Sequence, residues 1–278
     1  MTAIERICAN TRRSLLCVGL DPDTGKMPTA ITNNHRLPEE AIYAFLTQVI
    51  DATAPYAAVY KAQKAMFDIY SAGHDLLKSV IAYTYSHYPH LPVVVDCKIG
   101  DIDNTMFAYI ENVFGKLQAD GIVVNPLMGD DVLAPLMELT DKAIVVLCKT
   151  SNPGGSIVQD ALMADGRPFW EHLLELTTTR WNARGNMIPV VSSTAGLDMA
   201  HVRRIIPDNM PILLAGVGAQ GGSYADLGKL LNGDRANVFV NSSRGILYPY
   251  DRNDECWLNR VTDAARAMMI DMEKQRHA

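Results

Sequence analysis

The segment Val93-Val94-Val95-Asp96-Cys97-Lys98-Ile99-Gly100-Asp101-Ile102 joins a short apolar run directly to three charged residues. The run 93–95 predicts a strand that is buried on both faces. Because side chains alternate along a strand, we expect Asp96 and Lys98 to point to one side and Cys97 to the other. Opposite charges at the end of a buried strand are costly to desolvate unless they are paired or used in chemistry. A structural ion pair is therefore an alternative to a catalytic one.

Eight strand-like apolar runs alternate with helical patterns along the chain. The runs cover residues 15–20, 57–61, 93–98, 121–125, 143–149, 188–193, 211–217 and 237–242. The helical patterns cover residues 38–54, 65–88, 104–118, 131–139, 168–182, 198–205, 223–231 and 255–274. A strand and a helix, repeated eight times, predict a (β/α)8 TIM barrel and disfavour the alternative, a doubly wound open sheet. With no linker or strong internal repeat, one domain over residues 1–278 is expected.

The composition is ordinary for a globular protein with a sizeable core. Of the 278 residues, 48% are hydrophobic and 20% are charged, and the formal net charge is −6. No basic surface that would attract nucleic acid is therefore expected. No apolar stretch reaches the roughly 18 residues that span a bilayer, and the first residues lack the apolar core of a secretory signal. We expect a cytoplasmic protein without nucleic-acid or membrane partners.

Polar residues occur at the same end of each predicted strand. They are Asp21, Lys61, Asp96 with Lys98, Asn125, residues 149–152, residues 192–194, residues 216–222 and residues 242–245. In a barrel these ends share one rim, which is the face where enzymes of this fold build their sites. Polar ends on all eight strands are difficult to explain as core chemistry. The sequence therefore predicts a functional site at this rim.

Four charges of alternating sign are expected along one arc of the rim. Asp21, Lys61, Asp96 and Lys98 follow the first three strands in turn. Neighbouring carboxylates favour the protonated form of a lysine. A protonated lysine in such a place can deliver a proton to carbon or stabilise a developing anion. The alternative is a belt of purely structural salt bridges.

A glycine-rich loop and an arginine predict a phosphate site at the last two strands. Glycines in the segment 216–222 free the backbone to turn its N–H groups toward an anion. Arg244, in Ser243-Arg244-Gly245, adds a guanidinium that suits phosphate oxygens. Loops after strands seven and eight form the usual phosphate site of this fold. A tight turn without a ligand is the alternative.

Residues 149–155, Lys-Thr-Ser-Asn-Pro-Gly-Gly, form a polar segment after the fifth strand. Its hydroxyl and amide groups suit the recognition of a flat heterocycle, and a plain turn is equally compatible with these residue types. The histidines lack the spacing of metal ligands, so no metal site is predicted.

Together these segments resemble a known family. Asp96-x-Lys98-x-x-Asp101-Ile102 looks like the D-x-K-x-x-D-I signature of orotidine 5′-phosphate decarboxylases. Other landmarks of that family occur in the same order, at residues 20–23, 60–61, 150–154, 218–222 and 243–245. The combination is most similar to the longer bacterial (type 2) branch. The charged signature also occurs in sugar-phosphate decarboxylases and hexulose-phosphate synthases, whereas the Ser-Asn-Pro-Gly and Gly-Ala-Gln-Gly-Gly stretches are more specific.

This chain departs from the usual family pattern at several positions. Gln63 stands where Asn is usual, Ile99 where Arg is usual, Asp103 where Gly is usual, and Ala215 where Pro is usual. These differences leave open a barrel that binds a phosphorylated ligand without turning it over. The shared charged signature leaves open a metal-dependent sugar-phosphate decarboxylase or aldolase.

The resemblance implies an enzyme, a carboxy-lyase that converts orotidine 5′-phosphate to uridine 5′-phosphate and carbon dioxide in pyrimidine biosynthesis. It implies that Lys98 protonates C6 of the pyrimidine while Asp96 faces the substrate carboxylate. Lys61 and Asp101 would complete the charge network. No metal and no cofactor is implied.

The resemblance also implies a set of binding residues. Asp21 and Lys61 would contact the ribose, and Ser151 the pyrimidine. The phosphate would be held by Gly218, Gln220, Arg244 and Gly245. Asp101, Ile102 and Thr105 would enter the site of the neighbouring subunit in a homodimer.

Overall fold

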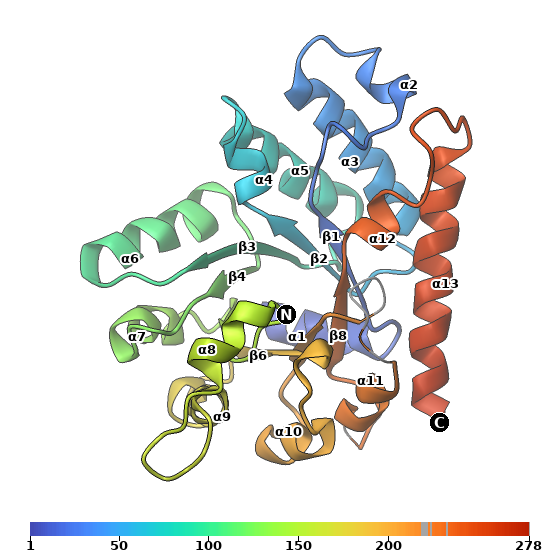
Figure 1. The fold of residues 1–278 in the computed structure, drawn as a ribbon. Helices are drawn as coiled ribbons and strands as arrows, with labels where there is room; N and C mark the ends of the chain where they lie inside the picture. Colours follow the sequence, from blue (N-terminus) through green and yellow to red (C-terminus); the bar gives the residue numbers. More distant parts are fainter. Residues whose placement is uncertain (218–221, 223, 232, 278) are drawn as a thin grey trace.

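Eight parallel strands close into a barrel in the order β1 to β8, with β8 paired to β1 (Figure 1). The computed structural model describes residues 1–217, 222, 224–231 and 233–277. The strands are β1 Leu16–Leu20, β2 Val59–Gln63, β3 Val93–Ile99, β4 Gly121–Val124, β5 Ala143–Leu147, β6 Met187–Ser192, β7 Ile212–Ala215 and β8 Val238–Ser242. The predicted (β/α)8 barrel is confirmed, and each predicted run contains a strand.

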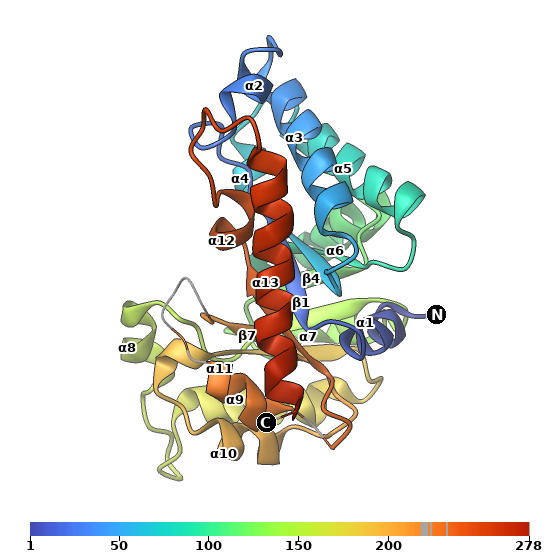
Figure 2. The ribbon, with the colours of Figure 1, turned by 90° about the vertical axis from the view of Figure 1, so that its right-hand side faces the viewer.

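Helices surround the barrel and follow its strands. They are α1 Ala3–Thr11, α2 Thr29–Thr32, α3 Pro38–Thr53, α4 Ala65–Asp68, α5 Gly73–His87, α6 Asp103–Ile110, α7 Asp130–Met137, α8 Ser156–Gln159, α9 Phe169–Thr178, α10 Met199–Ile205, α11 Tyr224–Leu230, α12 Arg244–Leu247 and α13 Trp257–His277. The long helix α13 runs down one side of the barrel beside α3, with Trp257 packed on Phe45 (Figure 2). Within the described chain, no helix has the length and apolarity that crossing a bilayer requires.

The helix predicted over residues 65–88 is interrupted, so that prediction is wrong in its length. α4 ends at Asp68 and α5 begins at Gly73. The turn brings the Gly73 backbone against the Phe67 carbonyl, where a Cβ atom would lie only 1.9 Å from the oxygen. A glycine at this position is therefore what permits the close approach.

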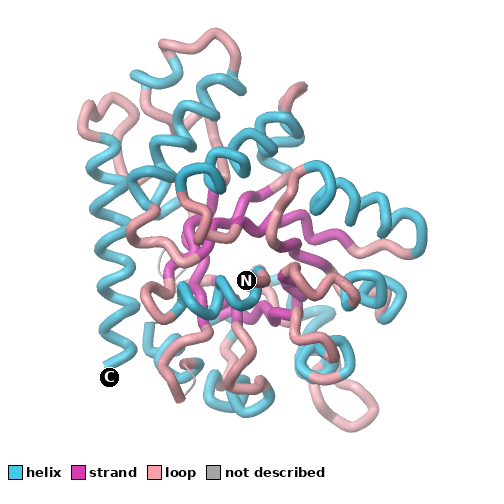
Figure 3. The backbone as a smooth tube through the Cα atoms, turned by 180° about the vertical axis from the view of Figure 1, so that it is seen from behind, coloured by secondary structure: helices cyan, strands magenta, loops and turns pink. Residues whose placement is uncertain are grey.

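The amino-terminal helix α1 was not anticipated, although its start carries a local signal. Thr2 accepts a hydrogen bond from the N–H of Glu5, and the Glu5 side chain accepts one from the N–H of Thr2. This reciprocal capping box is typical of a helix start. α1 lies across the amino-terminal end of the barrel, which is seen from behind in Figure 3. Its Ile7 side chain is fully buried in the barrel interior.

Side chains inside the barrel change from apolar to polar toward the carboxyl ends of the strands. The interior cluster includes Ala3, Ile7, Cys17, Val59, Val94, Val123, Val145, Ile188, Leu213 and Phe239. Two residues after Val59 and Val94, the same inward position is occupied by Lys61 and Asp96. Because strand side chains repeat with period two, the apolar floor and the charged layer above it belong to the same strand faces. The polar site therefore lies directly above an apolar core inside the barrel.

Candidate active site

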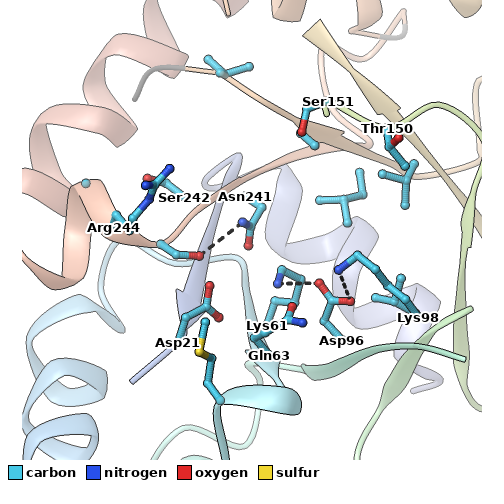
Figure 4. Close-up of a pocket in the computed structure, with 18 of the residues that line it drawn as sticks. Asp21, Lys61, Gln63, Asp96, Lys98, Thr150, Ser151, Asn241, Ser242 and Arg244 are labelled. Atoms are coloured by element: carbon cyan, nitrogen blue, oxygen red, sulfur yellow. Dashed lines mark hydrogen bonds and ion pairs between the residues drawn. The ribbon is translucent and has the colours of Figure 1, made fainter. Parts of the chain in front are cut away.

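A cavity of about 530 Å³ opens at the carboxyl ends of the strands. Its lining includes Asp21, Lys61, Gln63, Asp96, Lys98, Thr150, Ser151, Asn241, Ser242, Arg244, Gly245 and Tyr248. Figure 4 shows Arg244 on the opposite side of the cavity from the Asp96–Lys98 pair, with Thr150 and Ser151 on a third side. The volume is typical of a site for a small molecule. The cavity thus brings together polar ends from several different strands.

Asp96 is the centre of a buried charge cluster. Its side chain lies between two lysines: Lys61 Nζ donates to Oδ2 at 2.8 Å, and Lys98 Nζ donates to Oδ1 at 2.7 Å. Asp96 is 5% exposed and Lys61 is 6% exposed, whereas 46% of the Lys98 side chain is exposed. Both carboxylate oxygens are therefore held by cations, and Lys98 is the partner with access to the cavity and to solvent.

Neighbouring charges keep this cluster ionised. Burial works to raise the pKa of Asp96, but Lys61 and Lys98 outweigh it and hold that pKa below its ordinary value. Burial works to lower the pKa of Lys61, but Asp21 and Asp96 outweigh it and raise that pKa. Opposite charges at close range favour the charged forms of both groups. The site therefore presents fixed charges to whatever enters the cavity.

Lys98 reaches Asp96 by a route that simple strand alternation does not describe. The pairing of β3 with β4 is irregular between Asp96 and Ile99, which marks a bulge. Lys98 has φ of 47°, in the left-handed region that residues other than glycine seldom adopt. Such backbone strain is often found at functional sites, where the surrounding structure maintains it. The expected pairing of Asp96 and Lys98 is present, and the bulge turns the Lys98 side chain into it.

Asp21 completes the arc without an ion pair of its own within 4.0 Å among the described residues. It follows β1 and lines the cavity, and its negative charge acts on Lys61. Its Oδ1 atom is buried and has no hydrogen-bond partner among the described residues. A buried carboxylate oxygen in this state lacks the hydrogen bonds that such an atom usually makes. The predicted series of charges of alternating sign therefore extends along the rim from Asp21 to Lys98.

The far side of the cavity carries Arg244 at the start of α12. The Arg244 side chain is exposed, and no ion pair within 4.0 Å holds it among the described residues. Gly245 also lines the cavity. On the neighbouring strand end, Gly216 has φ of 87°, and Gly222 donates from its N–H to the Gly216 carbonyl. The predicted phosphate residues Gly218 and Gln220 lie outside the described residues.

The segment after β5 is held in place by buried and polar contacts. Lys149 is 3% exposed, and its Nζ atom donates to Asp160 at 2.5 Å. Gln159 accepts from the Thr150 N–H at 3.1 Å and also contacts the Thr150 hydroxyl. The contacts of Lys149 with Asp160 and of Thr150 with Gln159 join the end of β5 to the end of α8. Ser151 is therefore presented to the cavity on a fixed segment rather than on a free loop.

Three predicted residues lie away from this cavity. Asp101 accepts a hydrogen bond from the N–H of Ile102, and none of Asp101, Ile102 and Thr105 lines the cavity. Ile102 and Thr105 are exposed at the start of α6. Within one chain, the structure therefore brings together the charged arc, Ser151 and Arg244, but not these three residues.

The cavity lining also contains residues that were not predicted as binding residues, among them Asn241, Gln63 and Tyr248. Asn241 follows Phe239 by two positions on β8, so the period-two pattern could have identified it. Gln63 extends the Lys61 face of β2 in the same way. No local pattern identifies Tyr248. Among the described residues, no cluster of three or more His, Cys, Asp or Glu side chains has the geometry of a metal site.

Comparison with known proteins identifies relatives that cover nearly the whole chain. Residues 14–256 match the family model described as "Orotidine 5'-phosphate decarboxylase / HUMPS family". Orotidine 5′-phosphate decarboxylases from Bordetella avium and a Janthinobacterium species are 39% and 40% identical, covering 93% and 89% of this chain and 93% and 90% of their own. The solved OMP decarboxylase of Leishmania donovani is 32% identical, with a TM-score of 0.84 and complete coverage of both chains. This chain therefore belongs to the orotidine 5′-phosphate decarboxylase / HUMPS family.

Proposed function

We propose that this protein is an orotidine 5′-phosphate decarboxylase of pyrimidine biosynthesis, which forms uridine 5′-phosphate and carbon dioxide. The observation that carries the proposal is the buried Asp96 carboxylate held between Lys61 and Lys98 at one side of the cavity, with Arg244 at the other. A nucleotide of this kind has a carboxylate at one end and a phosphate at the other. The separation of the two charged regions matches that chemistry. Membership of the longer bacterial branch stays a prediction.

Lys98 is the proton donor in this proposal. The bond from C6 to the substrate carboxylate breaks, the electron pair stays on C6, and a proton from Lys98 Nζ replaces the lost group. Asp96 faces the substrate carboxylate. Repulsion between the two negative charges favours the loss of carbon dioxide from the substrate. Lys98 regains a proton from solvent, to which its side chain is open. Catalysis then depends on fixed charges and on binding energy from the remote phosphate, with no cofactor.

The binding roles in this proposal are those that the family resemblance implies, and the lining of the cavity supports them. Asp21 and Lys61, which both line the cavity, hold the ribose. Ser151 reads the pyrimidine from the segment after β5. Arg244 and Gly245, which line the cavity, bind the phosphate. Gly218 and Gln220, which lie outside the described residues, share this role. A charged nucleotide does not cross a membrane unaided, so we place the enzyme in the compartment that makes its substrate, the cytoplasm.

A homodimer with a shared site is part of the proposal. Asp101, Ile102 and Thr105 do not line their own cavity, so their role in the site requires a second copy. The surface near them is apolar: Ile102, Phe107, Leu127 and Met128 are 38%, 59%, 66% and 55% exposed. These residues lie on or beside α6 and α7, which are neighbours at the same side of the barrel (Figure 1). Exposed apolar residues gathered in this way favour a protein interface.

The decisive test is a decarboxylation assay on purified, chelator-treated protein, followed by loss of the ultraviolet absorbance of orotidine 5′-phosphate. We expect full turnover with chelator present. A requirement for a divalent ion would favour the sugar-phosphate decarboxylase or aldolase instead. Tight binding of uridine 5′-phosphate with no release of carbon dioxide would favour the non-catalytic barrel.

Subunit mixing tests the shared site. Lys98→Ala and Asp101→Asn should each be nearly inactive, but a mixed dimer contains one site with both changes and one site with neither. After exchange at equal concentrations, about a quarter of wild-type turnover should return, because half the dimers are mixed. The matched control mixes Lys98→Ala with the Lys98→Ala/Asp101→Asn double variant, which cannot rebuild a site. If the first mixture is as inactive as this control, the shared site is wrong.

A further inference from the structure

Tyr248 links two segments that lie far apart in the sequence. Its hydroxyl donates to the Asp21 carbonyl at 3.1 Å and accepts from the Asp23 N–H at 2.7 Å. These bonds hold the chain on both sides of Pro22, directly after β1. Burial raises the pKa of Tyr248, so the hydroxyl stays protonated and able to donate at neutral pH. One phenol therefore fixes the backbone that carries the Asp21 carboxylate.

Tyr248 is itself held firmly at the end of the helix that begins with Arg244. Its N–H donates to the Arg244 carbonyl at 3.1 Å, which closes the single turn of α12. Ile246 and Leu247 in that turn are fully buried. The Tyr248 ring stacks on Phe45, with ring centroids 5.8 Å apart and planes inclined by 4°. The same rigid turn thus begins with Arg244 and is followed directly by Tyr248, and both residues line the cavity.

The position of the Asp21 carboxylate determines whether it can accept a hydrogen bond from a ligand. Its buried Oδ1 atom has no hydrogen-bond partner among the described residues, and the side chain faces the cavity in Figure 4. A ligand hydroxyl that supplies the missing hydrogen bond would be recognised only if the carboxylate is held at the correct place. Within the described part of the chain, no donor holds the Asp21 side chain in place. The hydrogen bond from Tyr248 to the Asp21 carbonyl therefore restrains the backbone that carries this carboxylate.

We propose that Tyr248 is a positioning residue that couples the phosphate-binding turn α12 to recognition of the ribose by Asp21. This inference rests on the proposed function, because it takes the ribose and phosphate roles of Asp21 and Arg244 from it. The Tyr248 hydroxyl fastens the segment after β1 to the rigid turn α12, so the Asp21 carboxylate keeps a fixed position relative to Arg244. Tyr248 touches the backbone on both sides of Pro22, so it acts through Asp21.

The chain offers a matched control for this proposal. Tyr250 lies two residues further on, 6.4 Å from the Tyr248 ring, and its buried hydroxyl has no hydrogen-bond partner among the described residues. Tyr248→Phe and Tyr250→Phe each remove one buried phenolic oxygen and keep the ring. Only the first removes the two bonds to the segment after β1.

The experiment measures binding of uridine 5′-phosphate and of 2′,3′-dideoxyuridine 5′-phosphate, which lacks both ribose hydroxyls. Tyr248→Phe should weaken binding of the first by about three- to tenfold, the size expected for a neutral hydrogen bond, and leave the second unchanged. Tyr250→Phe should change neither. In an Asp21→Ala background, Tyr248→Phe should add no further loss, because the two residues act as one unit.

Equal losses for the two nucleotides, or the same loss with and without Asp21, would overturn the positioning role. Those results leave the decarboxylase assignment intact, since the wild-type turnover assay decides it separately. Failure of the wild-type protein to bind uridine 5′-phosphate would overturn both proposals.

Discussion

Asp96 and Asp120 are two buried aspartates at opposite ends of neighbouring strands, and they differ in what surrounds them. Asp96, 5% exposed, lies near the end of β3 and contacts two lysines beside a cavity. Asp120, 6% exposed, lies just before β4 at the amino-terminal end. It accepts from Arg6, from the Tyr85 hydroxyl at 2.6 Å and from the Val93 N–H at 2.9 Å.

The difference lies in what covers each carboxylate. Arg6 belongs to α1, which lies across the amino-terminal end, so the partners of Asp120 fasten this helix to the barrel. Lys98, the exposed partner of Asp96, faces an open cavity. In this fold, one end of the barrel serves stability and the other serves chemistry. A buried ion pair alone therefore does not identify an active site, and the space beside it decides its role.

The largest effect is expected from Lys98→Ala. Loss of a general acid should lower kcat by about 100- to 10,000-fold, because no other group then protonates C6. The melting temperature should change little, since Lys98 is half exposed and Asp96 keeps Lys61. The matched control is Lys64→Ala, which removes a lysine paired with Asp68 on the same rim and should keep normal turnover. Near-normal turnover of Lys98→Ala would break the contrast between the two barrel ends.

Asp120→Ala should lower the stability of the protein and leave its turnover unchanged, which is the reverse of the result expected for Lys98→Ala. It leaves Arg6 and Tyr85 without their shared acceptor, and breaking a buried pair of this kind should lower the free energy of unfolding by about 3–5 kcal/mol. Denaturant unfolding measures that loss, while kcat of the folded protein at low temperature should be unchanged. Asp141→Ala, at an exposed carboxylate of the same barrel end, should lower stability by less than about 1 kcal/mol. A large loss of kcat in folded Asp120→Ala would show that the amino-terminal end contributes to catalysis.

The smallest effect is expected for Asp96→Asn, in the dependence of the unfolding free energy on acid pH. Asp96 has a folded-state pKa below its unfolded value, so its contribution is present above about pH 4 and is lost as the pH falls through the folded-state pKa. The difference in unfolding free energy between wild type and Asp96→Asn should therefore shrink below about pH 4, by roughly 1.4 kcal/mol for each unit of pKa shift. Denaturant unfolding from pH 7 to pH 2 measures this difference. A difference that stays constant over the range would mean that Asp96 is not held ionised by its lysines.

Much of the fold could be read from local patterns, because apolar runs and helical periodicity depend on neighbours in the sequence. The eight strands were predicted in this way, and so were the polar residues at the rim end of each strand. Period two along β3 predicted that Asp96 and Lys98 lie on one side, but their ion pair forms through the bulge, which period two does not describe. The break between α4 and α5 could not be predicted from periodicity, because it depends on close contact between Gly73 and Phe67.

The sequence by itself determined the barrel class, the rim that bears polar residues and the order of the charged residues along it. Each of these depends on spacing along the chain, which hydrophobic burial and the strand repeat translate directly into structure. Only the tertiary structure decided that Lys98 turns at a bulge, that α1 covers the end holding Asp120, and that Tyr248 meets the Asp21 backbone. These contacts join residues on different elements, or depend on register between strands, so closure of the barrel sets their geometry and no local pattern encodes it.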